Sequence, residues 1–153
     1  MTSAAGESAR EARPYSVEQL WYLLLPRRWS CLAVLSTDRT PNTLRLARSL
    51  AEFGARHRRR PVELVDALEL DMERASEIAR RIGPDGDHSD VTESRFVVAL
   101  DSPIANPSAI EVLAATDAVA LLVEKGVTRI PDARKLVELV GRERLVGAVF
   151  AAD

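Results

Sequence analysis

The feature that most constrains the fold is a regular alternation of short apolar runs with segments of helical periodicity. The apolar runs occupy residues 31–36, 62–65, 96–100, 119–123 and 145–150. None of them has helical spacing, and such runs are typical of strands buried on both faces of a sheet. The intervening segments predict helices at residues 40–54, 71–82, 106–115 and 131–140.

Proline and glycine mark the ends of these helical segments. Pro41, Pro107 and Pro131 stand where a first helical turn is expected, and proline is favoured there because its missing N–H has no partner within the helix. Gly83 and Gly141 follow the last apolar positions of two helices, as helix-ending residues do. The alternation therefore predicts an α/β protein of three αβα layers with a mainly parallel sheet of five or more strands.

A parallel sheet of this kind also predicts where a ligand would bind. Such sheets bind ligands beyond the carboxyl ends of their strands, because the loops that differ between proteins gather there. The loops at that edge are predicted at residues 37–42, 66–69, 101–106 and 124–130.

The length of 153 residues suits a single domain. Residues 1–14 are small, polar and charged, and we interpret them as a disordered tail. Residues 15–153 are then expected to form one α/β domain. It opens with a helix from Ser16 to about Pro26, since Ser16 and Gln19 have the spacing of a capping box.

The composition limits the compartment and the partners. A net charge of −2 supplies no field that attracts nucleic acid, so nucleic acid is not an expected partner. The single cysteine, Cys31, cannot form an internal disulfide and fits a reducing cytoplasm. No apolar run approaches the roughly 18 residues that cross a bilayer. We therefore expect a cytoplasmic protein without a membrane span, which reaches the inner membrane only if a partner recruits it.

Three motifs in the second half of the chain occur in a characteristic order. An apolar run ends in Asp101-Ser102-Pro103, Ala115-Thr116-Asp117 precedes Ala120-Leu121-Leu122-Val123, and Gly147-Ala148-Val149-Phe150 follows. This order resembles the C-terminal half of the bacterial tyrosine kinases and polysaccharide co-polymerase ATPases, which are P-loop ATPases of the MinD and ParA type. In that family one strand ends in D-[ST]-P-P and the next is A-A-D-x-x-L-L-V. The resemblance covers roughly the last sixty residues well and the rest more loosely.

The same resemblance places the Walker A loop between the first strand and the helix after it, where the chain is degenerate. The family has a glycine-rich turn followed by Gly-Lys-Ser/Thr, whereas this chain has Pro41-Asn42-Thr43. No glycine lies between Ser36 and Thr43, although glycines let backbone N–H groups curl around phosphate. The lysine that bridges the phosphates is absent. The vestigial nucleotide positions are Thr37, Asp38, Arg39, Asn42 and Thr43.

The resemblance implies a vestigial Mg²⁺ site of Thr43, Asp66 and Asp101, with the two aspartates at strand ends on the same edge of the sheet. If they are remnants of a metal site they should lie close together. The alternative is that each aspartate caps a loop or the following helix. We expect no cofactor, with ATP and Mg²⁺ bound only if the vestigial site still functions.

The resemblance implies a function for such a chain. It would be a non-catalytic pseudo-ATPase that acts as a protein-interaction or regulatory subunit in exopolysaccharide or capsule synthesis or export. Its partner would be a protein such as a membrane-bound polysaccharide chain-length regulator. One alternative is an unorthodox ATPase or kinase in which Arg39 or Arg45 replaces the lysine. Another is a positioning protein of the MinD or ParA kind, acting at a membrane or on DNA.

The helix expected at residues 16–26 is apolar almost all round. One face must pack on the sheet, and the other is a candidate interface for a partner or a second copy. The residues predicted for that interface are Trp21, Tyr22, Leu25 and Trp29, with packing in the core as the alternative. A basic run at residues 56–60 has two interpretations, a binding site for nucleic acid or acidic lipid and a solvated helix end.

Overall fold

The computed structural model describes residues 17–27, 29–58, 61–83 and 95–151. The tail predicted at residues 1–14 lies outside these residues.

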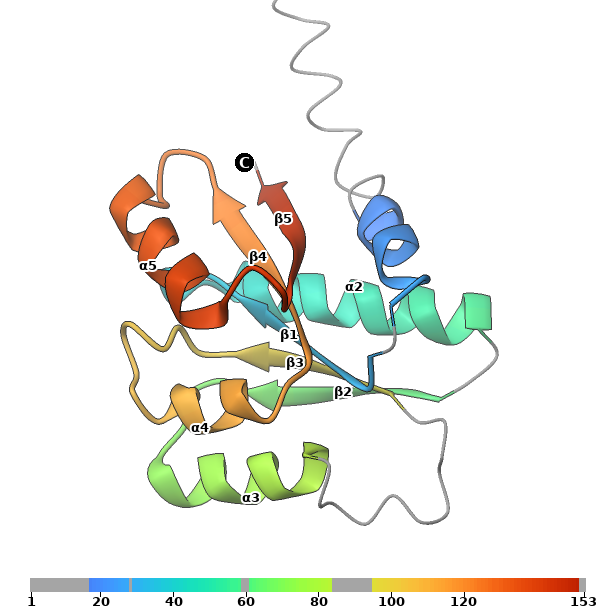
Figure 1. Cartoon of the computed structure of the whole chain (residues 1–153), viewed down its shortest axis with the longest axis horizontal. Helices are drawn as coiled ribbons and strands as arrows, with labels where there is room; N and C mark the ends of the chain where they lie inside the picture. The colour runs from blue at the N-terminus through green and yellow to red at the C-terminus, as the bar shows by residue number, and fades with distance from the viewer. Residues whose placement is uncertain (1–16, 28, 59–60, 84–94, 152–153) are drawn as a thin grey trace, which may run out of the picture.

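The centre of the molecule is a five-stranded sheet in which every neighbouring pair of strands is parallel (Figure 1). The strands are β1 (Cys31–Leu35), β2 (Val62–Ala67), β3 (Arg95–Leu100), β4 (Ala118–Glu124) and β5 (Leu145–Ala151). Their order across the sheet is β2-β3-β1-β4-β5. Ala33 at the middle of β1 pairs with Val98 of β3 and Val119 of β4, so β1 is the central strand.

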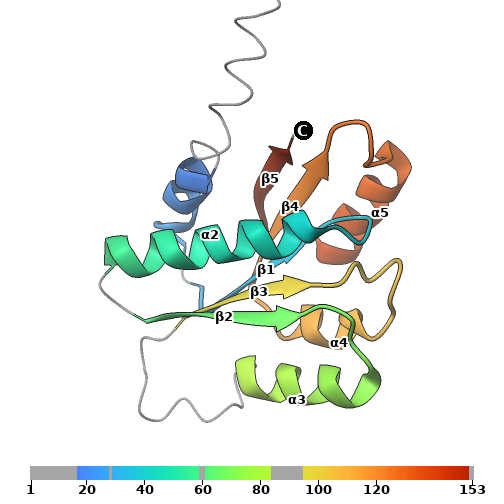
Figure 2. The ribbon, with the colours of Figure 1, turned by 180° about the vertical axis from the view of Figure 1, so that it is seen from behind.

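Helices cover both faces of the sheet. On one face lie α2 (Pro41–Arg58) and a short helix at residues 17–24, here called the N-terminal helix (Figure 2). On the other face lie α3 (Met72–Ile82), α4 (Ala109–Ala114) and α5 (Ile130–Val140). The prediction of a three-layer αβα fold with a parallel, P-loop-like sheet is therefore confirmed.

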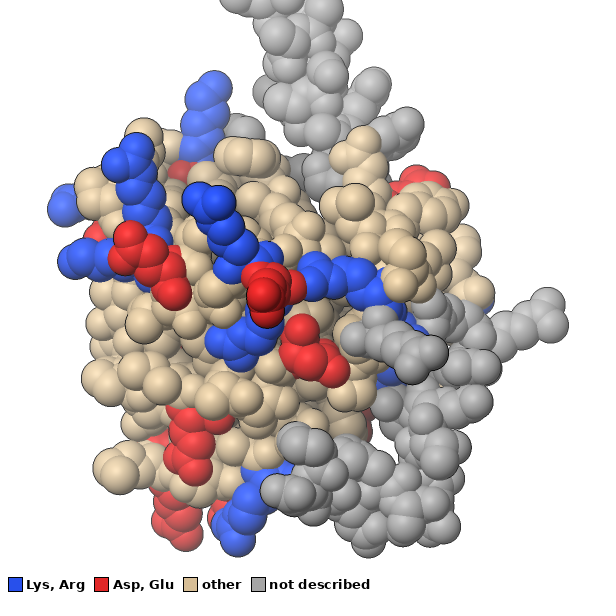
Figure 3. Space-filling view, in the orientation of Figure 1, with Lys and Arg blue, Asp and Glu red and all other residues tan. Residues whose placement is uncertain are grey.

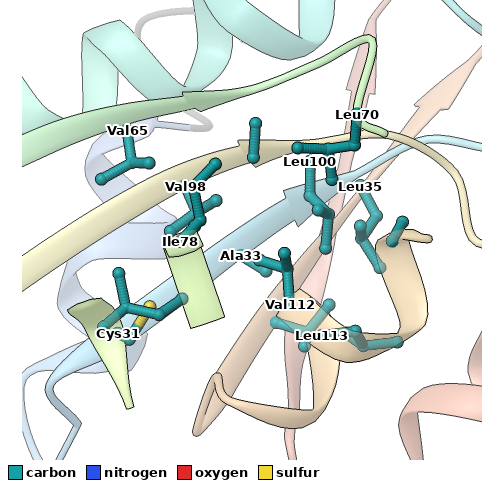
Figure 4. Packing of buried hydrophobic residues seen from close by; sticks show 14 of the residues in the cluster. Cys31, Ala33, Leu35, Val65, Leu70, Ile78, Val98, Leu100, Val112 and Leu113 are labelled. Atoms are coloured by element: carbon teal, nitrogen blue, oxygen red, sulfur yellow. The ribbon is translucent and has the colours of Figure 1, made fainter. Parts of the chain in front are cut away.

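The side chains of β1 divide the core into two halves. Cys31, Ala33 and Leu35 point to the face covered by α3 and α4, where they meet side chains such as Ile78 and Val112 (Figure 4). The alternate residues, Leu32 and Val34, belong to the cluster under α2 and the N-terminal helix. All five residues of β1 are buried, as the continuous apolar run predicted.

Helix α2 runs on to Arg58, although the sequence predicted its end near Gly54. The reason is that Gly54 lies against the indole ring of Trp21, inside the domain. A Cβ atom at this position would come within 2.6 Å of Trp21 Cη2. The glycine therefore permits a close helix–helix approach and does not end the helix.

Helix α4 is shorter than predicted, because it begins at Ala109 and not near Asn106. The side-chain oxygen of Asn106 accepts a hydrogen bond from the backbone N–H of Ser108 at 3.1 Å, so Asn106 stabilises a turn that precedes the helix. Across the described part of the chain, no helix combines the length and the apolarity needed to cross a membrane.

Candidate functional site

A small cavity lies beyond the carboxyl ends of β1 and β3, at the edge where a parallel sheet binds ligands. Its volume is about 100 Å³. The polar residues that line it include Ser36, Asp38, Arg39, Thr43, Asp101 and Asn106. The structure thus brings together three of the five predicted nucleotide positions and one of the two predicted metal-site aspartates.

The loop between β1 and α2 is folded back on itself by its own hydroxyl groups. The Ser36 hydroxyl donates a hydrogen bond to the backbone carbonyl of Asp38 and lies 3.3 Å from Thr43 Oγ1. The Thr37 hydroxyl donates to the Asp38 carboxylate at 3.0 Å. Ser36, Thr37 and Thr43 are all buried. Their hydroxyl groups therefore hold the loop closed around the start of α2.

Asn42 contributes to a different part of the surface. Its backbone N–H donates to Thr40 Oγ1 at 3.2 Å, so the Thr40 hydroxyl caps the start of α2. Its side-chain amide donates to Glu124 Oε2 at 3.1 Å, at the end of β4. Asn42 does not line the small cavity, and its side chain is directed toward β4 instead.

Asp101 connects two loops at the carboxyl edge of the sheet. It is buried, and its Oδ2 atom accepts hydrogen bonds from the backbone N–H of Leu70 at 3.0 Å and from Asn106 Nδ2 at 2.9 Å. The same Asn106 amide also donates to the Leu70 carbonyl at 2.9 Å. The carboxylate of Asp101 thus fixes the loop after β2 to the loop after β3.

Asp66 lies outside the cavity and is exposed. Its Oδ1 atom accepts a hydrogen bond from the backbone N–H of Leu68 at 3.1 Å, so it caps its own loop. Thr43 and Asp101 share the cavity, and Asp66 does not join them. Within the described ranges, no group of three or more histidine, cysteine, aspartate or glutamate residues is arranged to hold a metal ion.

Of the two arginines considered as lysine substitutes, Arg39 is the one that lines the cavity. Its guanidinium lies 3.9 Å from the carboxylate of Glu69, and both side chains are exposed. An exposed pair at this distance is weak, typically below about 1 kcal/mol. Arg45 lines a separate groove on the face of α2.

Sequence reasoning did not single out four polar residues of this cavity, which are Ser36, Thr40, Ser102 and Asn106. The Ser102 hydroxyl is buried at the cavity wall and has no hydrogen-bond partner among the described residues. The sequence marks Ser102 only as part of the Asp101-Ser102-Pro103 motif and Asn106 only as the first residue of a predicted helix.

A larger groove of about 560 Å³ lies between the N-terminal helix, α2 and the β4–β5 side of the sheet. Apolar side chains form much of it, including Val17, Phe53, Leu122, Val149 and Phe150. No pattern in the sequence marked this groove, because its walls come from four segments far apart in the chain.

Two of the four residues predicted for a partner interface are core residues. Trp21 is 2% exposed and Trp29 is 5% exposed, and their rings meet edge to face with centroids 5.7 Å apart. Both indoles belong to the buried cluster that also contains Leu46 and Leu50 of α2. Tyr22 is 56% exposed, and Leu25 is exposed too, so these two remain on the surface as predicted candidates.

Cys31 and Asp117 hold the start of β1. The Asp117 carboxylate accepts hydrogen bonds from the backbone N–H groups of Ser30 at 2.9 Å and Cys31 at 3.1 Å. Burial raises the pKa of the Cys31 thiol well above its ordinary value, and the charge of Asp117 raises it further. The thiol is therefore a protonated core group.

Neither a scan against protein-family models nor a search of curated proteins matches this chain. The functional assignment therefore depends on the geometry of the carboxyl edge and on the resemblance of the motifs.

Proposed function

We propose that this chain is a non-catalytic relative of the P-loop ATPases that acts as a regulatory or protein-interaction subunit. The observation that supports this proposal is the closed loop between β1 and α2, which folds over the position where a Walker A loop would cradle phosphate. Ser36 anchors the loop at the carbonyl of Asp38 and beside the hydroxyl of Thr43.

The space at this position is too small for a nucleotide. The cavity measures about 100 Å³, whereas pockets for ligands of that size usually measure roughly 300–1,000 Å³. Since one water molecule takes about 30 Å³ of liquid, the cavity has room for a few waters. A nucleoside triphosphate and its Mg²⁺ do not fit the residues present.

The polar groups at the cavity also oppose phosphate binding. Pro41 lacks the N–H that a phosphate-binding turn would supply, and Asp38 adds a negative charge at the cavity. The Asp101 carboxylate already accepts two hydrogen bonds, so a metal ion would compete with the Leu70 N–H and the Asn106 amide. These contacts favour a role that does not include ATP hydrolysis.

The interaction role rests on the exposed part of the N-terminal helix together with the resemblance of the motifs. Tyr22 and Leu25 present apolar surface to solvent, and aromatic residues are enriched where proteins meet. The resemblance to polysaccharide co-polymerase ATPases points to a membrane-bound chain-length regulator as the partner. The process would then be exopolysaccharide or capsule synthesis or export.

Isothermal titration of the full chain with Mg·ATP tests the proposal. We expect no saturable heat and no phosphate release above a protein-free blank. Micromolar affinity or steady turnover would contradict the proposal.

The second candidate is an unorthodox ATPase, which is favoured by the presence of Arg39 and the unpaired Ser102 hydroxyl at the same cavity as Asp101. If turnover is found, Arg39→Ala should abolish it, and Arg45→Ala should preserve it because Arg45 lies in the other groove. Both side chains are exposed, so neither substitution should disturb folding.

A further inference from the structure

The two outer strands of the sheet, β2 and β5, differ in how their free edges are protected. An unprotected edge presents backbone N–H and C=O groups that can pair with another strand, so proteins usually block it with charge or cover it. Whichever of these two edges lacks such protection is the one available for pairing with another strand.

The edge at β2 is protected by charged residues. Glu63 and Asp66 are exposed on this strand, and Glu63 forms an ion pair with Arg81. The guanidinium of Arg74 donates a hydrogen bond to the Asp66 carbonyl at 2.6 Å. A further strand could pair with β2 only by displacing these groups.

Among the described residues, no charged side chain protects the edge at β5 beyond its start. Its seven residues, Leu-Val-Gly-Ala-Val-Phe-Ala, include no charge and no proline. Arg27 donates hydrogen bonds to the carbonyls of Glu143 and Leu145, which blocks only the start of the strand. Among the strands that the structure describes, β4 alone pairs with β5.

The surface around this edge is apolar as well. Phe150 is 68% exposed on β5, and Ala148 is exposed at the middle of the strand. Leu23 of the N-terminal helix is exposed and reaches Gly147, whose missing Cβ would lie 3.7 Å from Leu23 Cδ1. In Figure 3 charged side chains gather over α5 and near the start of β5, and the surface over the end of β5 is largely uncharged.

We propose that β5 pairs with β5 of a second copy of this chain, antiparallel about a two-fold axis near Ala148. The two five-stranded sheets then join into one continuous sheet. A two-fold axis presents the same edge on both copies, so a single contact satisfies the open backbone groups of both. Because the strand carries no charge, its two copies meet without like-charge repulsion.

The residues of β5 suit this pairing. Gly147 and Ala148 are small, so the centres of the two strands can approach without steric conflict. Phe150 lies two residues from the centre, where it can cover the neighbouring strand instead of facing water. This inference is independent of the nucleotide question, because the edge of β5 is separate from the cavity beyond β1 and β3.

Sedimentation of the full chain over a concentration series provides the first test. We expect a dimer in the wild type and a monomer in Ala148→Lys and in Ala148→Glu, because like charges then oppose each other at the axis. An equimolar mixture of the two variants should recover the dimer. Met72→Lys adds the same charge at an exposed apolar residue on α3 and should leave the dimer intact.

A covalent test covers the case in which a charged variant fails to fold. Directly opposite residues in antiparallel pairs have Cα atoms roughly 4.5–5.5 Å apart, which suits a disulfide. Ala148→Cys should therefore form a disulfide-linked dimer in air, as two thiols lose two protons and two electrons to oxygen. Cys31 is buried and should not compete. A wild type that stays monomeric, or a dimer that Ala148→Lys does not weaken and Ala148→Cys does not cross-link, would overturn the proposal.

Discussion

The carboxylate of Asp101 accepts a hydrogen bond from the backbone N–H of Leu70 at 3.0 Å, between the loops that follow two neighbouring strands. The resemblance of the motifs places a magnesium-binding aspartate at this position, and in this chain the carboxylate binds the protein's own backbone. Its second partner, the Asn106 amide, also holds the Leu70 carbonyl. Asp101 thus acts as a link between loops, and this role predicts how the protein responds to its removal.

Replacing Asp101 with alanine should destabilise the fold. The change leaves the Leu70 N–H without its acceptor, and a buried hydrogen bond to a charged group typically contributes about 1.5–3 kcal/mol. We expect the free energy of unfolding to fall by about 2 kcal/mol, measured by urea denaturation.

Asp66→Ala is the matched control, because Asp66 also ends a strand but is exposed. It should change stability by less than about 0.5 kcal/mol. Addition of Mg²⁺ should shift the midpoint of neither the wild type nor Asp66→Ala. A stabilisation by Mg²⁺ that requires both aspartates would instead indicate a working metal site.

The sequence predicted the layers of the fold well, because strands buried on both faces leave continuous apolar runs. All five predicted strands and the four helices between them are present, with shifts at their ends. The position of the small cavity was also predictable, since it follows from parallel strands alone. The contacts inside it were not, because they join residues far apart in the chain, such as Asn42 and Glu124.

The contact between Trp21 and Gly54 was also not predictable from the sequence. Helical periodicity places Trp21 on a helix, but periodicity does not reveal that Gly54 makes room for its ring. A glycine near the end of a helical pattern resembles a helix stop whether it ends the helix or allows close packing. Only the position of the N-terminal helix against α2 shows that Gly54 allows close packing and does not end the helix.

Gly54→Ala tests this packing. Alanine favours a helix over glycine by about 1 kcal/mol, so an open site would gain stability. Here the new methyl group would lie 2.6 Å from Trp21 Cη2, and the ring is enclosed by Trp29 and Phe53. Because overpacking costs about 1–3 kcal/mol, we expect a net loss of roughly 1 kcal/mol in thermal or urea unfolding.

A double-mutant cycle provides the control for this prediction. Trp21→Phe removes the ring atoms nearest to Gly54. The cost of Gly54→Ala should therefore be smaller in the Trp21→Phe background than in the wild type. Equal costs in both backgrounds would mean that the methyl group meets no resistance from Trp21.

Introducing two Walker A residues should not produce ATP turnover. In Pro41→Gly with Asn42→Lys, the new lysine would lie beside the Glu124 carboxylate, since the Asn42 amide already contacts it. An ion pair there would hold the ammonium group away from the small cavity. We expect no phosphate release from this double variant in a coupled assay, and none after adding Glu124→Gln, because Ser36 and Asp38 still close the loop. Measurable turnover in either variant would show that the closed loop is not the obstacle.

Cys31 should make the fold sensitive to alkaline pH. Burial raises the pKa of its thiol above the ordinary value of 9.0, so the unfolded chain loses this proton first. The contribution of the protonated thiol to the free energy of unfolding is complete below pH 9.0 and declines as the pH rises toward the pKa of the folded state. For one proton the slope is about 1.4 kcal/mol per pH unit.

Urea unfolding between about pH 8 and pH 10 measures this slope. All other side chains are the same in the two proteins, so the informative quantity is the difference in slope between the wild type and Cys31→Ala. We expect a shallower decline in Cys31→Ala. Identical slopes would mean that the thiol titrates equally in the folded and unfolded chains.

The aromatic residues of the N-terminal helix should separate folding from partner binding. Trp29→Ala removes a buried ring, and large-to-small changes of this kind cost about 3–5 kcal/mol, so the variant should unfold or melt far earlier. Tyr22→Ala removes an exposed ring and should leave the melting temperature nearly unchanged.

If the exposed face of this helix binds a polysaccharide chain-length regulator, loss of an aromatic anchor should weaken that complex by about 2 kcal/mol, or roughly thirtyfold. Calorimetry with the regulator's cytoplasmic segment measures the effect, and Met72→Ala, at an exposed apolar residue on α3, is the matched control. Equal affinities for the wild type, Tyr22→Ala and Met72→Ala would exclude Tyr22 from the binding surface.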